Sequence, residues 1–233
     1  MRDRASTSVA RAVRRTALSV DVVLLTPHGR RLTMLLRRSS TADTRERWEL
    51  PWDALHEGET LPAASARLAR SALGTSPALL EQIAAFGEGR RHPGGASVAV
   101  AFLGLAPAGV GTVVGGNASW FPVDELPALP PAQRVMVDAA LNALRARIDQ
   151  SPIAFRLLPP TFTLSQLQEV YELLLGRRLH KASFRRALHA AWLVEPTDEW
   201  RSEGRGRPAQ LYRYAPRKRR ARRRGVRFEG LAG

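Results

Sequence analysis

Short apolar runs of strand length recur through the first half of the chain. The runs at 17–25 and 31–38 are rich in Val and Leu, and the Pro and Gly of the intervening TPHGR predict a turn. Further strands are expected within the sequences WELP, EQIAAFGE, ASVAVAFLGLA and SWFPVDELPALP, and the last of these also contains a turn. Strands of this kind, mixed with helical segments, predict an α/β domain.

Two segments of this half have helical spacing instead. Thr60 can cap a helix that runs to about Leu73. Pro62 is compatible with this helix, since proline is tolerated in a first turn. Its apolar side is formed by Leu61, Ala64, Leu68 and Ala72. A longer helix is expected from Pro131 to about Asp149, and its apolar side is formed by Val135, Val137, Ala140, Leu141 and Leu144. Each helix therefore has one side that can pack on a core.

The pattern changes after Ser151. The sequence FTLSQLQEVYELLLG predicts a helix capped by Thr163 and closed by Gly176, and HKASFRRALHAAW predicts a second helix soon after it. The sequences LVEPTDEW, RSEGRGRPA and QLYRYA then predict a strand, a tip and a strand. Helix, short turn, helix and β-ribbon is the order of a winged helix-turn-helix.

These patterns divide the chain of 233 residues into five parts. We expect a basic N-terminal arm at 1–15, an α/β domain at 16–130, a linker helix at 131–150, a winged helix-turn-helix at 151–216 and a basic tail at 217–233. The tail is dense in charge and poor in apolar residues, so it is expected to be disordered.

Composition indicates the cellular compartment of the protein. Cysteine is absent, which excludes disulfides and thiolate metal sites. The first residues lack the apolar core of a signal peptide. The uncharged run from Ala96 to Gly116 contains several Gly and Pro107, so a buried strand followed by a loop is expected there instead of a membrane span. The sequence therefore predicts a cytoplasmic protein.

The charge balance favours polyanionic partners. Lys and Arg number 36 against 21 Asp and Glu, a formal net charge of +15 that suits nucleic acid first and an anionic membrane surface second. Lys occurs only at positions 181 and 218, so arginine-rich coding is an alternative source of the excess. The position of the charge therefore matters more than its total.

The second helix of the C-terminal half carries basic residues on one face. Phe184, Ala187, Leu188 and Ala191 share the apolar face, and Ala182, Arg185, Arg186 and His189 lie opposite. A small residue among basic side chains suits insertion into the major groove of double-stranded DNA. The candidate DNA-binding residues are Lys181, Ser183, Arg185, Arg186 and His189, with Arg205 and Arg207 at the tip of the ribbon. The alternative is that these are ordinary surface arginines.

Residues 16–128 resemble the Nudix hydrolases, chiefly through the stretch from Leu50 to Gly74. The Nudix box places Gly, then Glu six residues later, then an Arg-Glu-aliphatic-any-Glu-Glu helix, then Gly; Glu59, Arg67 and Gly74 match it. Asp53 replaces the opening Gly, and Leu68, Ser71 and Ala72 replace the three helical glutamates. The resemblance implies that those glutamates hold Mg²⁺ or Mn²⁺, so we predict no catalytic residue, no metal, no cofactor and no hydrolysis. A chance match in an Ala-rich helix is the alternative.

A second segment is similar to the ADP-ribose-handling Nudix proteins. In FGEGRRHPGGASVAVAF, the positions Phe86, Gly87, Arg91, Pro93 and Gly95 match the pattern of those proteins. His92, Gly94 and Ala96 replace an acid and two arginines. The candidate ligand-binding residues are Arg91, Arg90, Trp52 and Glu59, and Trp48 also borders the expected cleft. The alternative is that Arg90 and Arg91 are solvated loop charges.

The C-terminal half resembles the Nudix-related transcriptional regulators of NAD metabolism, the NrtR type. The matching text is SPIAFRLLPPTFTLSQLQEVYELLLGRRLHKASFRRALHAAWLVEPTDE and GRGRPAQLYRY. The resemblance implies a Nudix-like α/β/α sandwich followed by a smaller winged helix-turn-helix domain. It also implies a homodimeric repressor of NAD-related genes that binds a palindromic operator and senses ADP-ribose or a related nucleotide metabolite. Two alternatives stay open: an atypical Nudix hydrolase, and a constitutive DNA-binding protein with a structural Nudix-like dimerisation domain.

Overall fold

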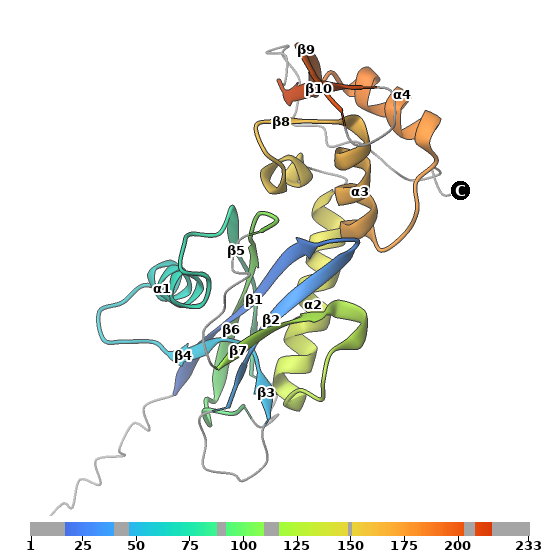
Figure 1. The fold of residues 1–233 in the computed structure, drawn as a ribbon. Helices are drawn as coiled ribbons and strands as arrows, with labels where there is room; N and C mark the ends of the chain where they lie inside the picture. Colours follow the sequence, from blue (N-terminus) through green and yellow to red (C-terminus); the bar gives the residue numbers. More distant parts are fainter. Residues whose placement is uncertain are drawn as a thin grey trace, which may run out of the picture.

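A mixed β-sheet with helices on both faces forms the first half of the protein (Figure 1). The computed structural model describes residues 17–39, 47–87, 92–109, 117–148, 151–202 and 208–215. The strands are β1 (Leu18–His28), β2 (Arg31–Arg38), β3 (Trp48–Glu49), β4 (Trp52–Ala54), β5 (Leu79–Phe86), β6 (Val98–Leu105) and β7 (Ala118–Pro122). The helices are α1 (Leu61–Leu73), the short 3₁₀ helix η1 (Val123–Glu125) and α2 (Pro131–Ile148).

The strand β1 lies at the centre of this sheet. The main path runs β3-β2-β1-β6-β5, while β4 pairs with β1 and β7 pairs with β2. β1 and β6 are parallel, with Leu18 opposite Val98 and Leu25 opposite Leu105, and the other pairings are antiparallel. A strand covered on both faces needs apolar residues on both, which is why β1 reads as a nearly continuous apolar run.

The two faces of the sheet have separate cores. Val20, Val22 and Leu24 of β1 pack with α1, whereas Val23 and Leu25 pack with α2. The buried side of α1 is formed by Ala64, Ser65, Leu68, Ala69 and Leu73. The buried side of α2 is formed by Ala132, Gln133, Met136, Val137, Ala140, Leu144 and Ile148. The α/β/α sandwich expected from the sequence is therefore confirmed.

The C-terminal half has the predicted order of a winged helix. Its elements are η2 (Ile153–Leu157), β8 (Thr161–Phe162), α3 (Leu164–Leu175), α4 (Lys181–Ala191), β9 (Val194–Arg201) and β10 (Ala209–Tyr214), and the sheet order is β8-β10-β9. Thr163 caps α3 in a capping box with Gln166, and Gly176 ends it with a φ of 68°. Both signals were readable in the sequence.

The helix α2 connects the two halves through a shared core. Buried residues of α2, such as Met136 and Leu144, belong to the same hydrophobic cluster as Phe155 of η2, Tyr171 of α3 and Phe184 of α4. Figure 1 shows α2 running along the sheet and reaching α3 at its far end. The α/β half and the helix-turn-helix half are thus joined by packing as well as by chain connectivity.

The structure differs from the sequence-based expectations at several places. The strand β1 continues through Thr26 and Pro27 to His28, which pairs with Arg31, so the turn contains only Gly29 and Arg30. Gly29 has a φ of 57°, a conformation that glycine adopts without strain. The strand predicted from WELP is present as β3, whereas the next strand, β4 at Trp52–Ala54, which pairs with β1, was not predicted. The two-residue strand β8 and the helix η2 were not predicted.

Three further expectations concern the uncharged run from Ala96 to Gly116 and the two ends of the chain. The uncharged run that begins at Ala96 does contain the buried strand β6, while 110–116 lies outside the described residues. Within the described ranges, no helix is long and apolar enough to cross a membrane. The predicted arm at 1–15 and the predicted tail at 217–233 also lie outside the described residues.

Candidate functional site

A three-residue ion cluster holds the loop of the Nudix box against α1. Arg67 donates from Nε to Glu59 Oε1 and from Nη2 to Glu59 Oε2, each at 2.9 Å, and from Nη1 to Asp53 Oδ2 at 2.8 Å. The hydrogen bonds from Arg67 lower the pKa of Glu59 to about 2. Burial alone would raise the pKa of Asp53, but hydrogen bonds from Arg67 and from the Ala54 amide outweigh it and lower that pKa. Glu59 and Arg67, which both match the Nudix box, are thus paired with each other, and Asp53 is a second partner of Arg67.

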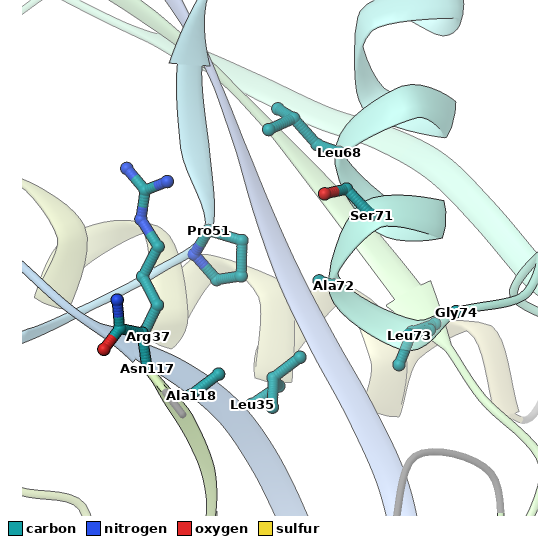
Figure 2. A pocket seen from close by; sticks show the side chains of 10 residues that line it. All are labelled: Leu35, Arg37, Pro51, Leu68, Ser71, Ala72, Leu73, Gly74, Asn117 and Ala118. Atoms are coloured by element: carbon teal, nitrogen blue, oxygen red, sulfur yellow. The ribbon is translucent and has the colours of Figure 1, made fainter. Parts of the chain in front are cut away.

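A pocket of about 430 Å³ lies where the box would carry its helical glutamates (Figure 2). Leu68, Ser71 and Ala72 all line it from α1. The other lining residues are Leu35, Arg37, Pro51, Leu73, Gly74, Asn117 and Ala118. Replacement of three carboxylate side chains by an aliphatic, a hydroxyl and a methyl group therefore leaves an open, partly apolar hollow.

The residues around this pocket do not fit the divalent cation that the Nudix fold implies. Mg²⁺ and Mn²⁺ prefer several anionic oxygen ligands. Of the three carboxylates that remain in the box and loop, Asp53 and Glu59 are hydrogen-bonded to Arg67, and Glu57 is exposed to solvent. Among the described residues there is also no group of three or more His, Asp or Glu side chains that could hold a metal ion. No catalytic step can be derived through a metal here.

A buried polar network ties β1 to the segment that begins at His92 and to α2. His92 Nε2 lies 3.0 Å from Asp21 Oδ1, and Gln133 Nε2 donates to the same oxygen at 2.9 Å. Ser19 Oγ donates to Asp21 Oδ2 at 3.0 Å, and the Leu50 amide donates to Gln133 Oε1 at 2.9 Å. Asp21 and Gln133 are fully buried, so these partners supply the hydrogen bonds that water cannot.

The indole of Trp52 covers this network. It meets the His92 ring edge to face at 4.9 Å, and the Arg37 guanidinium lies 5.2 Å from its centroid. A Cβ at Gly94 would come within 2.3 Å of the indole, so any larger residue would displace Trp52. Neither Trp52 nor Trp48 lines the pocket, contrary to the expectation that both border the cleft, and the Trp48 ring packs against Phe121 with ring centroids 4.8 Å apart.

In the winged helix, α4 presents the expected polar face. Phe184 and Leu188 are fully buried, and Ala187 and Ala191 pack beside them. The exposed residues of the helix are Lys181, Ala182, Arg185, Arg186, His189 and Ala190. Ser183 is half-buried, and its Oγ lies 3.2 Å from His180 Nδ1 and accepts from Arg186 Nη2 at 3.4 Å. A guanidinium, an ammonium and an imidazole thus share one solvent-facing surface.

Comparison with known proteins covers nearly the whole chain. The NUDIX domain family matches residues 15–140, and the NrtR DNA-binding winged helix domain matches residues 154–214. A curated relative, the ADPR responsive transcriptional repressor NtrR of Acinetobacter baylyi, is 30% identical over 205 residues, which are 85% of this chain and 82% of that protein. The chain belongs to the NrtR family.

Solved structures agree with this assignment. The crystal structure of Shewanella oneidensis NrtR complexed with a 27mer DNA is 30% identical, covers 85% of this chain and 94% of that chain, and has a TM-score of 0.72. A MutT/nudix family protein from Enterococcus faecalis has a TM-score of 0.68 at 19% identity, covers 87% of this chain and 89% of that one, and shows the likeness of fold alone.

The predicted site residues of this NrtR-family chain fall into three groups. Trp52 and Glu59 are described, and both oxygens of Glu59 are engaged by Arg67, which favours a structural role for that carboxylate. The α4 residues share one face, as above. Arg90 and Arg91 of the signature segment, and Arg205 and Arg207 of the ribbon tip, lie outside the described residues.

Sequence reasoning missed three residues of the sensor half: Arg37, Asp21 and Gln133. Asp21 carried a signal, since a lone acid in an apolar strand needs a buried partner. Arg37 and Gln133 carried none, because an arginine near a strand end and a glutamine in a helix are ordinary until their neighbours are known.

Proposed function

We propose that the protein is a transcriptional repressor of NAD-related genes that binds DNA through its winged helix and senses ADP-ribose, or a related nucleotide metabolite, through a non-catalytic Nudix domain. The observation that carries the proposal is the exposed basic face of α4, placed in a winged helix that packs on a Nudix domain whose box has lost three glutamates. The names of the relatives from Acinetobacter and Shewanella support both halves of it.

On the DNA side, α4 enters the major groove. Lys181, Ser183, Arg185, Arg186 and His189 contact bases or phosphates from the helix, and Arg205 and Arg207 contact the backbone or minor groove from the ribbon tip. The protein acts as a homodimer on a palindromic operator, since two-fold symmetry of the reader matches two-fold symmetry of the site. The proposed units are the sensor at 16–130, the linker at 131–150 and the reader at 151–216, flanked by the arm at 1–15 and the tail at 217–233.

On the sensor side, the ligand is bound and not hydrolysed. Arg90 and Arg91 contact its phosphates or ribose, because guanidinium groups form paired hydrogen bonds with phosphate. Trp52 contacts the pocket-lining Arg37 through its ring, and Glu59 keeps the neighbouring loop in place through Arg67. Leu68, Ser71 and Ala72 provide neither metal ligands nor a general base, so turnover has no chemical route through the box.

Ligand and DNA affect each other through the relative arrangement of the two halves. A ligand shifts DNA affinity only if it prefers one of two arrangements. The helix α2 suits this role because Gln133 near its start bonds to the sensor sheet, while Ile148 at its end packs in the core shared with α3.

A titration of ADP-ribose into the protein–operator complex tests the proposal. Operator fragments are first selected from genomic DNA with the full chain, and a scrambled duplex of equal length serves as control. We expect ADP-ribose to change operator affinity by roughly fivefold or more and the scrambled duplex to show no comparable change.

Each alternative has its own outcome in this experiment. Metal-dependent release of products from ADP-ribose, lost in Glu59→Gln, would identify a hydrolase and overturn the non-catalytic assignment. Binding to the operator with no stabilisation or affinity change by ADP-ribose would identify a constitutive DNA-binding protein.

A further inference from the structure

The pocket on α1 differs in charge from a metal-binding Nudix box. Leu68, Ser71 and Ala72 carry no charge, so three carboxylates that would repel an anionic ligand are missing from this wall. Of the three acids that remain in the box and its loop, Asp53 and Glu59 are both ion-paired with Arg67, and Glu57 is exposed to solvent. An active box needs a cation between its carboxylates and a phosphate. The α1 side of this pocket has no such carboxylates, so a phosphate can approach it without a cation.

The charged group that lines the pocket is the guanidinium of Arg37. This residue lies on β2 opposite Glu49 of β3 and Ala118 of β7, and its side chain is 32% exposed. Its Nε donates to the buried Glu49 carboxylate at 3.2 Å, and its plane lies over Trp52. Among the described residues, neither terminal nitrogen of Arg37 has a hydrogen-bond partner, which leaves two donors for a ligand.

Two neutral donors flank the same space. Figure 2 shows the Ser71 hydroxyl pointing from α1 toward the side on which Arg37 lies, and the Asn117 amide beside the stem of Arg37. The floor between them is apolar and includes Leu35 and Ala72. A few converging donors over an apolar floor are typical of small-ligand sites, and a guanidinium with free terminal nitrogens suits an oxygen pair of a phosphate.

We propose that this pocket is a cation-independent phosphate site, in which Arg37 takes the place that a divalent metal would hold and anchors the diphosphate of the sensed nucleotide. The proposal rests on the sensing function above, and it assigns to Arg37, Ser71 and Asn117 a binding role. Its central consequence is that ligand affinity does not depend on Mg²⁺ or Mn²⁺.

Calorimetric titration of the full-length protein tests this, with ADP-ribose and ADP as the two probes, each in chelator and in Mg²⁺. We expect both probes to bind in chelator, and Mg²⁺ to change either dissociation constant by less than about twofold. Arg37→Gln keeps a hydrogen bond to Glu49 but loses the charge, and it should weaken both probes by roughly tenfold or more.

A second variant tests the same site without depending on whether Arg37→Gln folds. Ser71→Glu restores one family carboxylate at an exposed position of α1 and leaves Arg37 and Glu49 untouched. It should weaken both probes in chelator by roughly threefold or more. Ala63→Glu adds the same charge to an exposed position of the same helix outside the pocket, and it should bind like the unmodified protein.

The outcomes separate the two proposals. Binding that requires Mg²⁺ or Mn²⁺, or unchanged affinity in Arg37→Gln or Ser71→Glu, overturns the phosphate site but leaves sensing intact. A third result is that ADP binds in chelator and loses binding in Arg37→Gln, while ADP-ribose does not bind at all. This result supports the phosphate site and overturns sensing of ADP-ribose. If neither probe binds, both proposals fail.

Discussion

At the residue scale, Arg67 illustrates how a box residue can persist while the chemistry around it changes. Its guanidinium engages both oxygens of Glu59 and one oxygen of Asp53, the residue that replaces the opening glycine of the box. With three short charge-assisted hydrogen bonds, the arginine fixes the loop between β4 and α1. The ion cluster therefore has a structural role, holding this loop, that needs no metal.

The Glu59–Arg67 pair makes stability depend on pH in a defined direction. Hydrogen bonds from Arg67 lower the pKa of Glu59 from 4.5 to about 2, and the pKa of Asp53 is lowered as well. A depressed folded-state pKa means that this contribution is fully present above about pH 4.5 and is lost as the pH falls toward 2.

Arg67→Met should therefore lower the free energy of unfolding at neutral pH and flatten its decline between these pH values. Urea unfolding at a series of pH values measures this, and a carboxyl NMR titration should show the pKa of Glu59 rising in the variant. Arg70→Met, on the exposed side of the same helix, is the matched control. Equal pH profiles for Arg67→Met and the unmodified protein would contradict the assignment.

At the element scale, α4 combines two faces with separate roles. Phe184 and Leu188 bury the inner face, which sets the position of the helix on α3. The outer face then presents Arg185, Arg186 and His189 together, because residues three and four apart share one side of a helix. Because the apolar face of α4 is buried, its basic face is directed toward solvent.

Arg186→Ala should lower affinity for the selected operator by about 1–3 kcal/mol and affinity for random DNA much less, because a guanidinium in the major groove can pair with guanine edges. Binding titrations of operator and scrambled duplexes at several salt concentrations measure both effects. Arg70→Ala removes the same charge from an exposed position of α1 and should leave both affinities nearly unchanged. If Arg186→Ala weakens both duplexes equally, the helix does not read bases.

At the scale of the whole molecule, α2 links the sensor network to the DNA reader. Gln133 is fully buried and bonds to Asp21 of β1 and to the Leu50 amide, and Asp21 also contacts His92. The other end of α2 packs in the core that contains Tyr171 and Phe184. A change at His92 thus has a continuous, buried route to the winged helix through Asp21, Gln133 and the core of α2.

Gln133→Leu should reduce the effect of ADP-ribose on operator affinity while both ligands still bind separately. Loss of the two buried hydrogen bonds should also lower the free energy of unfolding by about 1–3 kcal/mol. Titration of the operator with and without ADP-ribose measures the coupling, and urea unfolding measures stability. Arg134→Leu changes the neighbouring, exposed residue, whose ion pair with Asp138 lies on the surface, and should keep the coupling. Full coupling in Gln133→Leu would exclude this route.

By itself, the sequence determined the longer elements and the family of this protein. Helix caps at Thr60 and Thr163, helix-ending glycines at Gly74 and Gly176, and apolar periodicity are local signals, so α1, α3 and α4 were predictable. The absence of glutamates at 68, 71 and 72 was likewise readable, because the box is one contiguous segment.

Only the tertiary structure decided which distant residues meet. Arg37 and Ser71 line one pocket although they lie on β2 and α1, and Asp21, His92 and Gln133 come from three separate segments. The unpredicted strand β4 likewise depended on pairing with β1. Caps and periodicity act over a few residues, whereas a pocket or a buried polar network depends on side chains that only the packing of sheet and helices brings together.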